Sequence, residues 1–162
     1  MDRALKFEAQ QYGTLLHGDV KGANIFFSRR PDIDSSSPRK CALYDFQYVG
    51  VGLVTRDLVY FLGTSVQNAL VWQAGHEKDL LRTYHAKLVQ AMRGRQDSHV
   101  TLQNHPEYTF DTLWVHWELA IVDWYRFMAG WGFWGNDSWI ARRAKEITTE
   151  WTQRGFSCTI AA

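Results

Sequence analysis

The chain has 162 residues, of which 46% are hydrophobic and 22% charged, and its formal net charge is +1. This length suits one domain with a buried core, and the composition excludes a disordered chain. The near-zero charge gives no electrostatic reason to expect nucleic acid or a membrane surface as a partner. No apolar run reaches the length of a membrane span, and Cys41 and Cys158 fit neither a disulfide framework nor a metal site. We therefore expect a globular, cytoplasmic protein.

The first half of the chain predicts one helix followed by short strands. Residues 2–11 are good helix formers, and Gly13 after them is a common terminator. The polar segment 29–40 holds two prolines and is predicted as an exposed connection, so that 25–45 forms a hairpin with a long tip. Residues 46–55 are predicted as a loop because of their glycines. Apolar, β-branched and aromatic residues predict strands at three places: 15–17, 24–28 and 41–45.

The second half predicts helices. The first begins at Thr55, a residue type that often caps helices. Segments 75–94 and 109–129 carry apolar residues at steps of three and four, as helices with one buried face do. Asn136 or Asp137 is expected to cap a last helix. Because strands come early and helices late, the predicted fold class is α+β and helix-dominated.

Two short stretches carry residues suited to chemistry. Residues 15–24 have the spacing His-x-Asp-x-x-x-x-Asn, with Asp19 as the acid and Asn24 as the amide. Residues 42–47 contain an apolar run that ends in Asp45, followed by phenylalanine. This is a phosphotransfer pattern. One carboxylate can meet a substrate hydroxyl, an amide oxygen five residues later can reach a metal, and a second carboxylate can hold that metal against phosphates.

With these motifs the chain resembles the aminoglycoside phosphotransferase and choline-kinase-like branch of the protein-kinase-like fold. His17-Gly18-Asp19 and Asp45-Phe46-Gln47 match that branch's two motifs, and residues 43–65 are similar to its ecdysteroid-kinase-like members. Gln47 stands where protein kinases carry glycine, which favours a small-molecule substrate over a protein. The resemblance assigns residues 1–157 to the C-terminal catalytic lobe of this fold, in which a β-hairpin carries the catalytic and metal-binding loops beside a helical bundle.

The resemblance implies an ATP- and Mg²⁺-dependent phosphotransferase acting on a small-molecule alcohol. It also places the loop and lysine that hold nucleotide phosphates in an N-terminal lobe before residue 1, and this sequence contains neither. We therefore expect a catalytic-lobe fragment that is inactive alone. Two other readings stay open: a kinase-like binding or regulatory module without catalysis, and a metal-dependent phosphohydrolase.

The resemblance also implies roles for the motif residues. Asp19 is the expected catalytic base, which orients the acceptor hydroxyl and takes its proton. Asn24 and Asp45 are the expected ligands of Mg²⁺ and, through it, of ATP. His17 is expected to be structural, packed under the loop. Each of these residue types also occurs in ordinary turns, so the argument depends on the complete pattern.

Three further assignments leave alternatives open. Lys21 either neutralises the transferring phosphate or is a solvated loop lysine. Asp57 either accepts hydrogen bonds from catalytic-loop amides or is an ordinary first-turn helix residue. The aromatic segment 110–139 is mostly core, but some of its rings could line a substrate pocket. In that case Glu118 and Asp123 could pair with a cationic substrate that also makes cation–π contacts.

Overall fold

The computed structural model describes residues 2–28, 40–93 and 107–155. The predicted connection 29–40 therefore lies, except for Lys40, outside the described residues, and so does the predicted lobe boundary at residue 157. The helix-dominated α+β class is confirmed. The elements in chain order are α1 (Asp2–Tyr12), β1 (Thr14–Leu16), the 3-10 turn η1 (Gly22–Asn24), β2 (Ile25–Phe27), β3 (Cys41–Leu43), β4 (Gly50–Gly52), α2 (Thr55–Thr64), α3 (Asn68–Trp72), α4 (His76–Arg93), α5 (Phe110–Trp131) and α6 (Asp137–Arg154).

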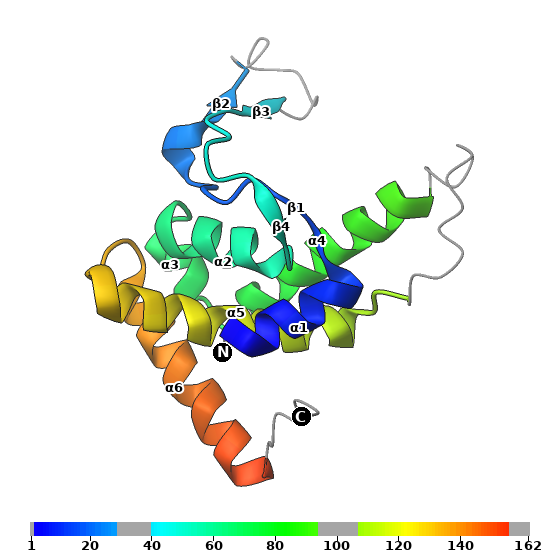
Figure 1. Cartoon of the computed structure of the whole chain (residues 1–162). Coiled ribbons are helices and arrows are strands. Elements are labelled where there is room, and N and C mark those ends of the chain that lie inside the picture. Colours follow the sequence, from blue (N-terminus) through cyan, green and yellow to red (C-terminus); the bar gives the residue numbers. More distant parts are fainter. Residues whose placement is uncertain (1, 29–39, 94–106, 156–162) are drawn as a thin grey trace.

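Helix α5 is the centre of the helical body, and α1, α2, α4 and α6 all pack against it (Figure 1). Its apolar residues recur at steps of three and four, as the sequence predicts, and each large one that is buried contributes about 1.5–3 kcal/mol. Although α5 has 22 residues, neither it nor any other helix in the described parts of the chain is suited to crossing a membrane. The fully buried apolar residues of α5 are Leu113, Trp117, Ala120, Ile121 and Met128.

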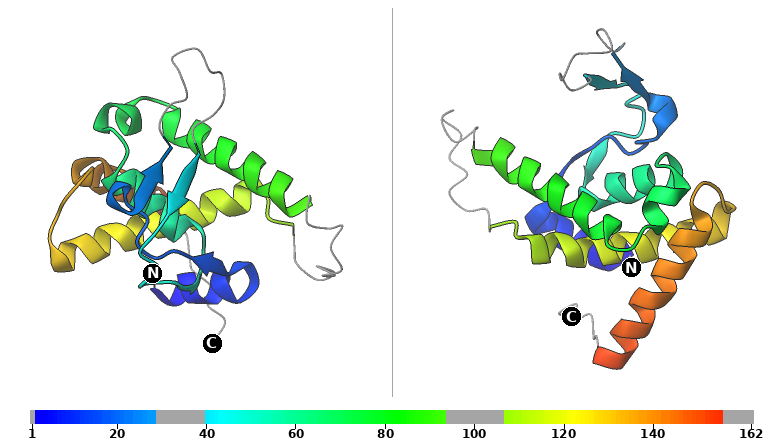
Figure 2. Two further views of the ribbon diagram at one scale, coloured as in Figure 1. Left: turned by 90° about the horizontal axis from the view of Figure 1, so that it is seen from above. Right: turned by 180° about the vertical axis from the view of Figure 1, so that it is seen from behind.

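The strands form two small antiparallel sheets. The predicted hairpin is confirmed: β2 pairs with β3, with Ile25 opposite Leu43. This hairpin stands away from the helical body in both side views (Figures 1 and 2). The second sheet pairs β1 with β4, with Thr14 opposite Gly52. Residues 46–55 were wrongly predicted to form only a loop, because a three-residue strand with two glycines carries almost no local strand signal.

The predicted cap at Thr55 is wrong, whereas Asn136 occupies the predicted cap position of α6 but makes no capping hydrogen bond; both side chains make tertiary contacts instead. Thr55 is the first residue of α2, and its hydroxyl donates to the carbonyl of His116 in α5 at 3.1 Å. Asn136 does precede α6, but its amide donates to the carbonyls of Leu62 and Val66 at 2.8 and 2.9 Å. Both side chains join α2 to the later helices, a role that a local capping pattern cannot reveal.

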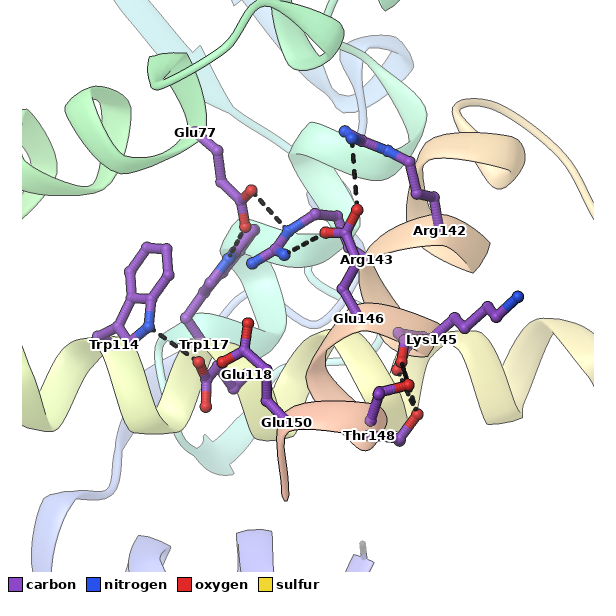
Figure 3. Close-up of polar contacts among 12 residues, drawn as sticks. Glu77, Trp114, Trp117, Glu118, Arg142, Arg143, Lys145, Glu146, Thr148 and Glu150 are labelled. Carbon is purple, nitrogen blue, oxygen red and sulfur yellow. Dashed lines mark hydrogen bonds and ion pairs between the residues drawn. The ribbon is translucent and has the colours of Figure 1, made fainter. Parts of the chain in front are cut away.

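A polar network ties α4, α5 and α6 together (Figure 3). The carboxylate of Glu77 accepts a hydrogen bond from the indole of Trp117 at 2.6 Å and lies 2.8 Å from Nε of Arg143. Arg143 also donates to Glu146 at 2.6 Å. Because the side chains of Glu77 and Arg143 are each only 13% exposed, removing one would leave the other charge buried and unpaired. The network therefore holds α4, α5 and α6 in a fixed arrangement.

Candidate active site

The loop after β1 is held by a carboxylate from α2. Asp57 accepts hydrogen bonds from the backbone N–H groups of His17 and Gly18, at 2.8 and 3.0 Å. Each oxygen of the carboxylate takes one amide, so the bond pair fixes the direction in which the loop leaves β1. These bonds have the geometry that the family resemblance implies for this position. They span about 40 residues of sequence, so the fold and not local preference brings them together.

His17 lies under the same loop and joins it to the strand that carries Asp45. Its Nε2 lies 2.8 Å from the carbonyl of Tyr44, and the backbone N–H of Asp19 donates to its Nδ1 at 3.3 Å. A carbonyl can only accept, so the proton sits on Nε2 and the ring is neutral when both bonds form. The ring also packs on Phe46, with centroids 4.7 Å apart.

Gly18 occupies a position that only glycine fits. Its φ of +82° is in the region that other residues rarely adopt, and an added Cβ would lie 2.2 Å from the carbonyl oxygen of Tyr48. The Tyr48 backbone therefore lies directly against the start of the loop. This contact places the segment after Asp45 beside Asp19.

Asp19 is only 4% exposed and is surrounded by donors. Lys21 donates to its Oδ2 at 2.9 Å, and Asn24 Nδ2 donates to its Oδ2 and to its backbone carbonyl, each at 2.9 Å. The Tyr60 hydroxyl also interacts with this carboxylate. Burial raises the pKa of Asp19, but the hydrogen bonds from Lys21, Tyr60 and Asn24 outweigh it, and the net pKa lies below 3.8. The group is therefore an anion at neutral pH.

Asn24 and Asp45 meet at the base of the hairpin. The N–H of Tyr44 donates to the carbonyl of Asn24 at 3.1 Å, which continues the β2–β3 ladder and leaves Asp45 one residue further on. Asp45 is exposed and has a φ of +64°, an uncommon conformation outside glycine that often marks functional sites. The structure therefore brings these two predicted residues together.

The donor atoms of this pair fit Mg²⁺. Both short bonds of the Asn24 side chain leave from Nδ2, so they do not use its amide oxygen. Magnesium prefers hard oxygen ligands and takes few from protein when phosphates and water complete its shell. Asn24 and Asp45 are a donor set of that kind. Within the described residues, no group of three or more His, Cys, Asp or Glu side chains is arranged to hold a metal.

A cavity of about 740 Å³ opens beside Asp19, between the loops and helices α2 and α5. One end is lined mainly by polar side chains, and the other is walled by the rings of α5 and the segment that follows. Tyr60 lies between the two ends. The principal side chains of the polar end are Asp19, Lys21, Gln47, Asp57 and Arg56, and those of the aromatic end are Trp124, Phe127, Trp131 and Trp134.

The aromatic end is a connected set of rings. Tyr60 packs on Trp124 with centroids 4.6 Å apart, and Trp124 stacks on Phe127 at 5.1 Å. Phe127 stacks in turn on Trp131 at 6.0 Å, and Trp134 meets Trp124 edge to face at 5.6 Å. Trp131 is 81% exposed, so a ligand that covered it would bury a large apolar surface. Some rings of segment 110–139 therefore line the cavity while others form the core.

Glu118 and Asp123 do not share the cavity. Five residues along a helix correspond to a turn of about 140°, so they project from different faces of α5. Glu118 accepts hydrogen bonds from the indoles of Trp114 and Trp151, at 2.9 and 3.1 Å (Figure 3 shows the Trp114 bond). Asp123 lines the cavity but is paired with Arg126 at 2.8 Å. The two carboxylates therefore cannot form one cation-binding site.

Residues 1–96 match the Ecdysteroid kinase-like family, and because this is more than half of the chain, the protein belongs to that family. No curated protein and no solved structure matches the chain. The matched region contains the whole polar end of the cavity, whereas α5 and the rings at the aromatic end lie beyond it.

Proposed function

We propose that the protein is the catalytic lobe of an ATP- and Mg²⁺-dependent kinase that phosphorylates a hydroxyl group on an uncharged small molecule with a large apolar body. The observation that carries this proposal is the position of Asp19. It lies at the polar end of a cavity, bonded to Asn24 and Lys21, with Asp45 at the adjoining hairpin base. The family that the chain belongs to supports the same reaction class.

In this reaction each motif residue has a distinct task. Asp19 accepts a hydrogen bond from the acceptor hydroxyl, aims its oxygen at the terminal phosphorus of ATP, and takes the proton as the new P–O bond forms and ADP leaves. Its lowered pKa makes it a weak base, so orientation is its larger contribution. Lys21 lies beside it and offers a positive charge to the transferring group. Asn24 and Asp45 hold Mg²⁺, which when bound neutralises the phosphate charge.

We further propose that residues 1–157 act together with an N-terminal lobe that covers the nucleotide. The face around β1, β4 and the loop that precedes β4 supports this arrangement because it exposes several large apolar side chains. Exposed apolar surface of this kind usually marks a contact with another protein surface. The side chains concerned and their exposures are Leu15 (74%), Val51 (76%), Tyr48 (64%) and Phe46 (54%).

The character of the acceptor is inferred from the cavity. Three cations, Lys21, Arg56 and Arg126, line it beside the carboxylates, and Asp123 is paired internally. Apart from these charged groups, the cavity wall is mainly aromatic. Such a wall suits a flat apolar body better than a small ammonium ion. The description of the family names ecdysteroids, which are steroid alcohols, and a molecule of that build fits both ends of the cavity.

The test is phosphate transfer from γ-labelled ATP in the presence of Mg²⁺, followed by mass analysis of the products. The enzyme is assayed as residues 1–162 and as a form that includes the N-terminal lobe, against steroid alcohols, choline, ethanolamine and sugars. We expect transfer to steroid alcohols by the two-lobe form only. Transfer restricted to amino alcohols or sugars would refute the acceptor assignment, and no transfer to any alcohol by the two-lobe form would refute the kinase.

A further inference from the structure

Helix α2 contacts the catalytic loop at both of the loop's ends. At the start, Asp57 in the first turn of α2 accepts the amides of His17 and Gly18. At the other end, the hydroxyl of Ser65, which directly follows α2, accepts a hydrogen bond from the N–H of Gly22 at 2.6 Å. The loop is therefore suspended along α2 between two side chains. The sequence gives no sign of the second contact, which joins residues 43 positions apart.

The direction of the hydrogen bonds around Ser65 follows from the number of protons available. Thr64 donates its only hydroxyl proton to the carbonyl of Tyr60 at 2.7 Å. Ser65 and Thr64 hydroxyl oxygens lie 3.0 Å apart, so Ser65 must donate to Thr64. Ser65 then accepts from Gly22 with its lone pair. The resulting chain runs from Gly22 N–H through both hydroxyls to the α2 backbone, and bonds in such chains polarise one another.

Gly22 is the point from which the position of Asn24 is set. It opens η1, which ends at Asn24, and its carbonyl accepts the N–H of Ile25. The N–H of Asn24 bonds back to the carbonyl of Lys21 at 2.8 Å. Fixing the Gly22 amide therefore fixes a turn of three residues whose last side chain contacts Asp19. Asn24 is 4% exposed, so its amide has little freedom to choose another orientation.

We propose that Ser65 is a positioning residue, whose hydroxyl anchors the Gly22–Asn24 turn and thereby places the Asn24 amide for both Asp19 and Mg²⁺. The part concerning Mg²⁺ rests on the proposed function. The contact is a hydrogen bond and not tight packing, because a Cβ added to Gly22 would lie 3.6 Å from the nearest atoms of Ser65, an ordinary contact distance. Ser65→Ala therefore removes the bond without disturbing the fit of the loop on α2.

The experiment uses NMR-detected hydrogen exchange on residues 1–162. In Ser65→Ala we expect the Gly22 amide to exchange about tenfold faster, as loss of one hydrogen bond implies, and the Asn24 side-chain amide to exchange faster as well. Ser65→Thr keeps the hydroxyl and restores both rates. Thr64→Val keeps the Gly22 bond but breaks the chain beyond it, so it gives a smaller change of the same sign. Ser138→Ala, which removes a hydroxyl bonded only to neighbouring Asp137, leaves both rates unchanged.

Two results would overturn the proposal: unchanged exchange at Gly22, or faster exchange at Gly22 with no change at Asn24. If Ser65→Ala does not fold, the Thr64→Val and Ser65→Thr variants decide by the same criteria. A second arm measures, in the two-lobe form, binding of Mn²⁺ with ATP, which should weaken about 10–100-fold in Ser65→Ala. Absence of Mn²⁺ binding in the unchanged two-lobe form would contradict the proposed function, whereas the exchange rates would still decide the role of Ser65 in placing Asn24.

Discussion

The two ends of the cavity are built on different physical principles. At the polar end, backbone amides and side chains are fixed by short hydrogen bonds, and Asp57, Asn24 and Ser65 each hold a part of one loop. At the aromatic end, rings of α5 and the following segment contact one another with centroids 5.1–6.2 Å apart and remain partly exposed, with Trp131 the most exposed. Directional hydrogen bonds therefore fix the groups at the polar end, whereas the aromatic end offers apolar contact area without directional bonds.

In our account, this contrast separates catalysis at the polar end from acceptor recognition at the aromatic end. Phosphoryl transfer depends on placing an oxygen in line with the phosphorus, which requires directional bonds. Recognition of an apolar body depends mainly on buried area, which tolerates variation in shape. The family match covers the directional end and stops before α5. In our account, residues 1–96 carry the reaction class and α5 carries acceptor preference.

Replacing the carboxylate at the polar end by an amide should have the largest effect. Asp19→Asn keeps the shape but removes the base, and we expect turnover in the two-lobe enzyme to fall about 10²–10⁴-fold. The matched control is Asp123→Asn at the aromatic end, which removes the charge from an ion pair whose arginine is exposed to solvent and should reduce turnover far less. Steady-state kinetics decide. Near-normal turnover in Asp19→Asn would show that the base is another group.

Adding one methyl group at each end should separate their tolerance of change. Gly18→Ala forces a φ of +82° on alanine and places its Cβ 2.2 Å from the Tyr48 carbonyl, so backbone strain alone should cost about 1–3 kcal/mol. Gly130→Ala in α5 meets no atom within 4 Å and should stabilise the helix by about 0.5–1 kcal/mol. Urea denaturation midpoints measure both. Equal midpoints for the two variants would contradict the tight contact at Gly18.

The charge of Lys21 should lower the pKa of Asp19, whereas the charge of Arg126 should not affect it. Because the folded pKa of Asp19 lies below 3.8, its contribution to stability is complete above that pH and is lost as the pH falls through the folded value. Lys21→Met removes a donor, so the pKa of Asp19 should rise, and the loss of stability should be smaller and should end at a higher pH. Arg126→Met is the control and should leave the pKa unchanged. Carboxyl NMR titration measures it, and an unmoved pKa in Lys21→Met would refute the coupling.

The exposed ring at the cavity mouth should affect binding and not folding. Trp131→Ala removes an 81% exposed side chain, so the free energy of unfolding should change by less than about 0.5 kcal/mol. Loss of its stacking area should weaken binding of a steroid alcohol by up to about tenfold, corresponding to about 0.5–1.5 kcal/mol. Trp72→Ala, which removes a ring that packs on Arg142 and does not line the cavity, is the control. Unchanged affinity in Trp131→Ala, measured by calorimetry, would move the acceptor elsewhere.

The sequence was informative wherever contacts are local or periodic. The hairpin, the long helices and the meeting of Asn24 with Asp45 follow from short motifs and apolar spacing. The partners of Thr55 and Asn136 were missed because their side chains bond residues 61 to 74 positions away. Strand β4 was missed because two of its three residues are glycines, which are depleted in strands.

The roles of individual rings and charges were harder to predict. A ring at helical spacing serves a core or a cavity equally well, and only the packing of α2 and α6 on α5 decides between them. Tyr60 and Ser65 carried no signal at all, since their neighbours at the site come from a distant loop. In contrast, a shared cation-binding site of Glu118 and Asp123 could have been excluded from the sequence, because a five-residue step turns a helix by about 140°.

The most direct test of the account is to locate the metal. Mn²⁺ is added with ATP to the two-lobe form, and paramagnetic broadening of NMR signals is followed for the unchanged protein and for Asp45→Asn, which removes the charge but tolerates the positive φ. The account predicts strongest broadening at the Asn24 side-chain amide and the Asp45 backbone, and its loss in Asp45→Asn. Broadening centred on another part of the chain, or unchanged by Asp45→Asn, would contradict it.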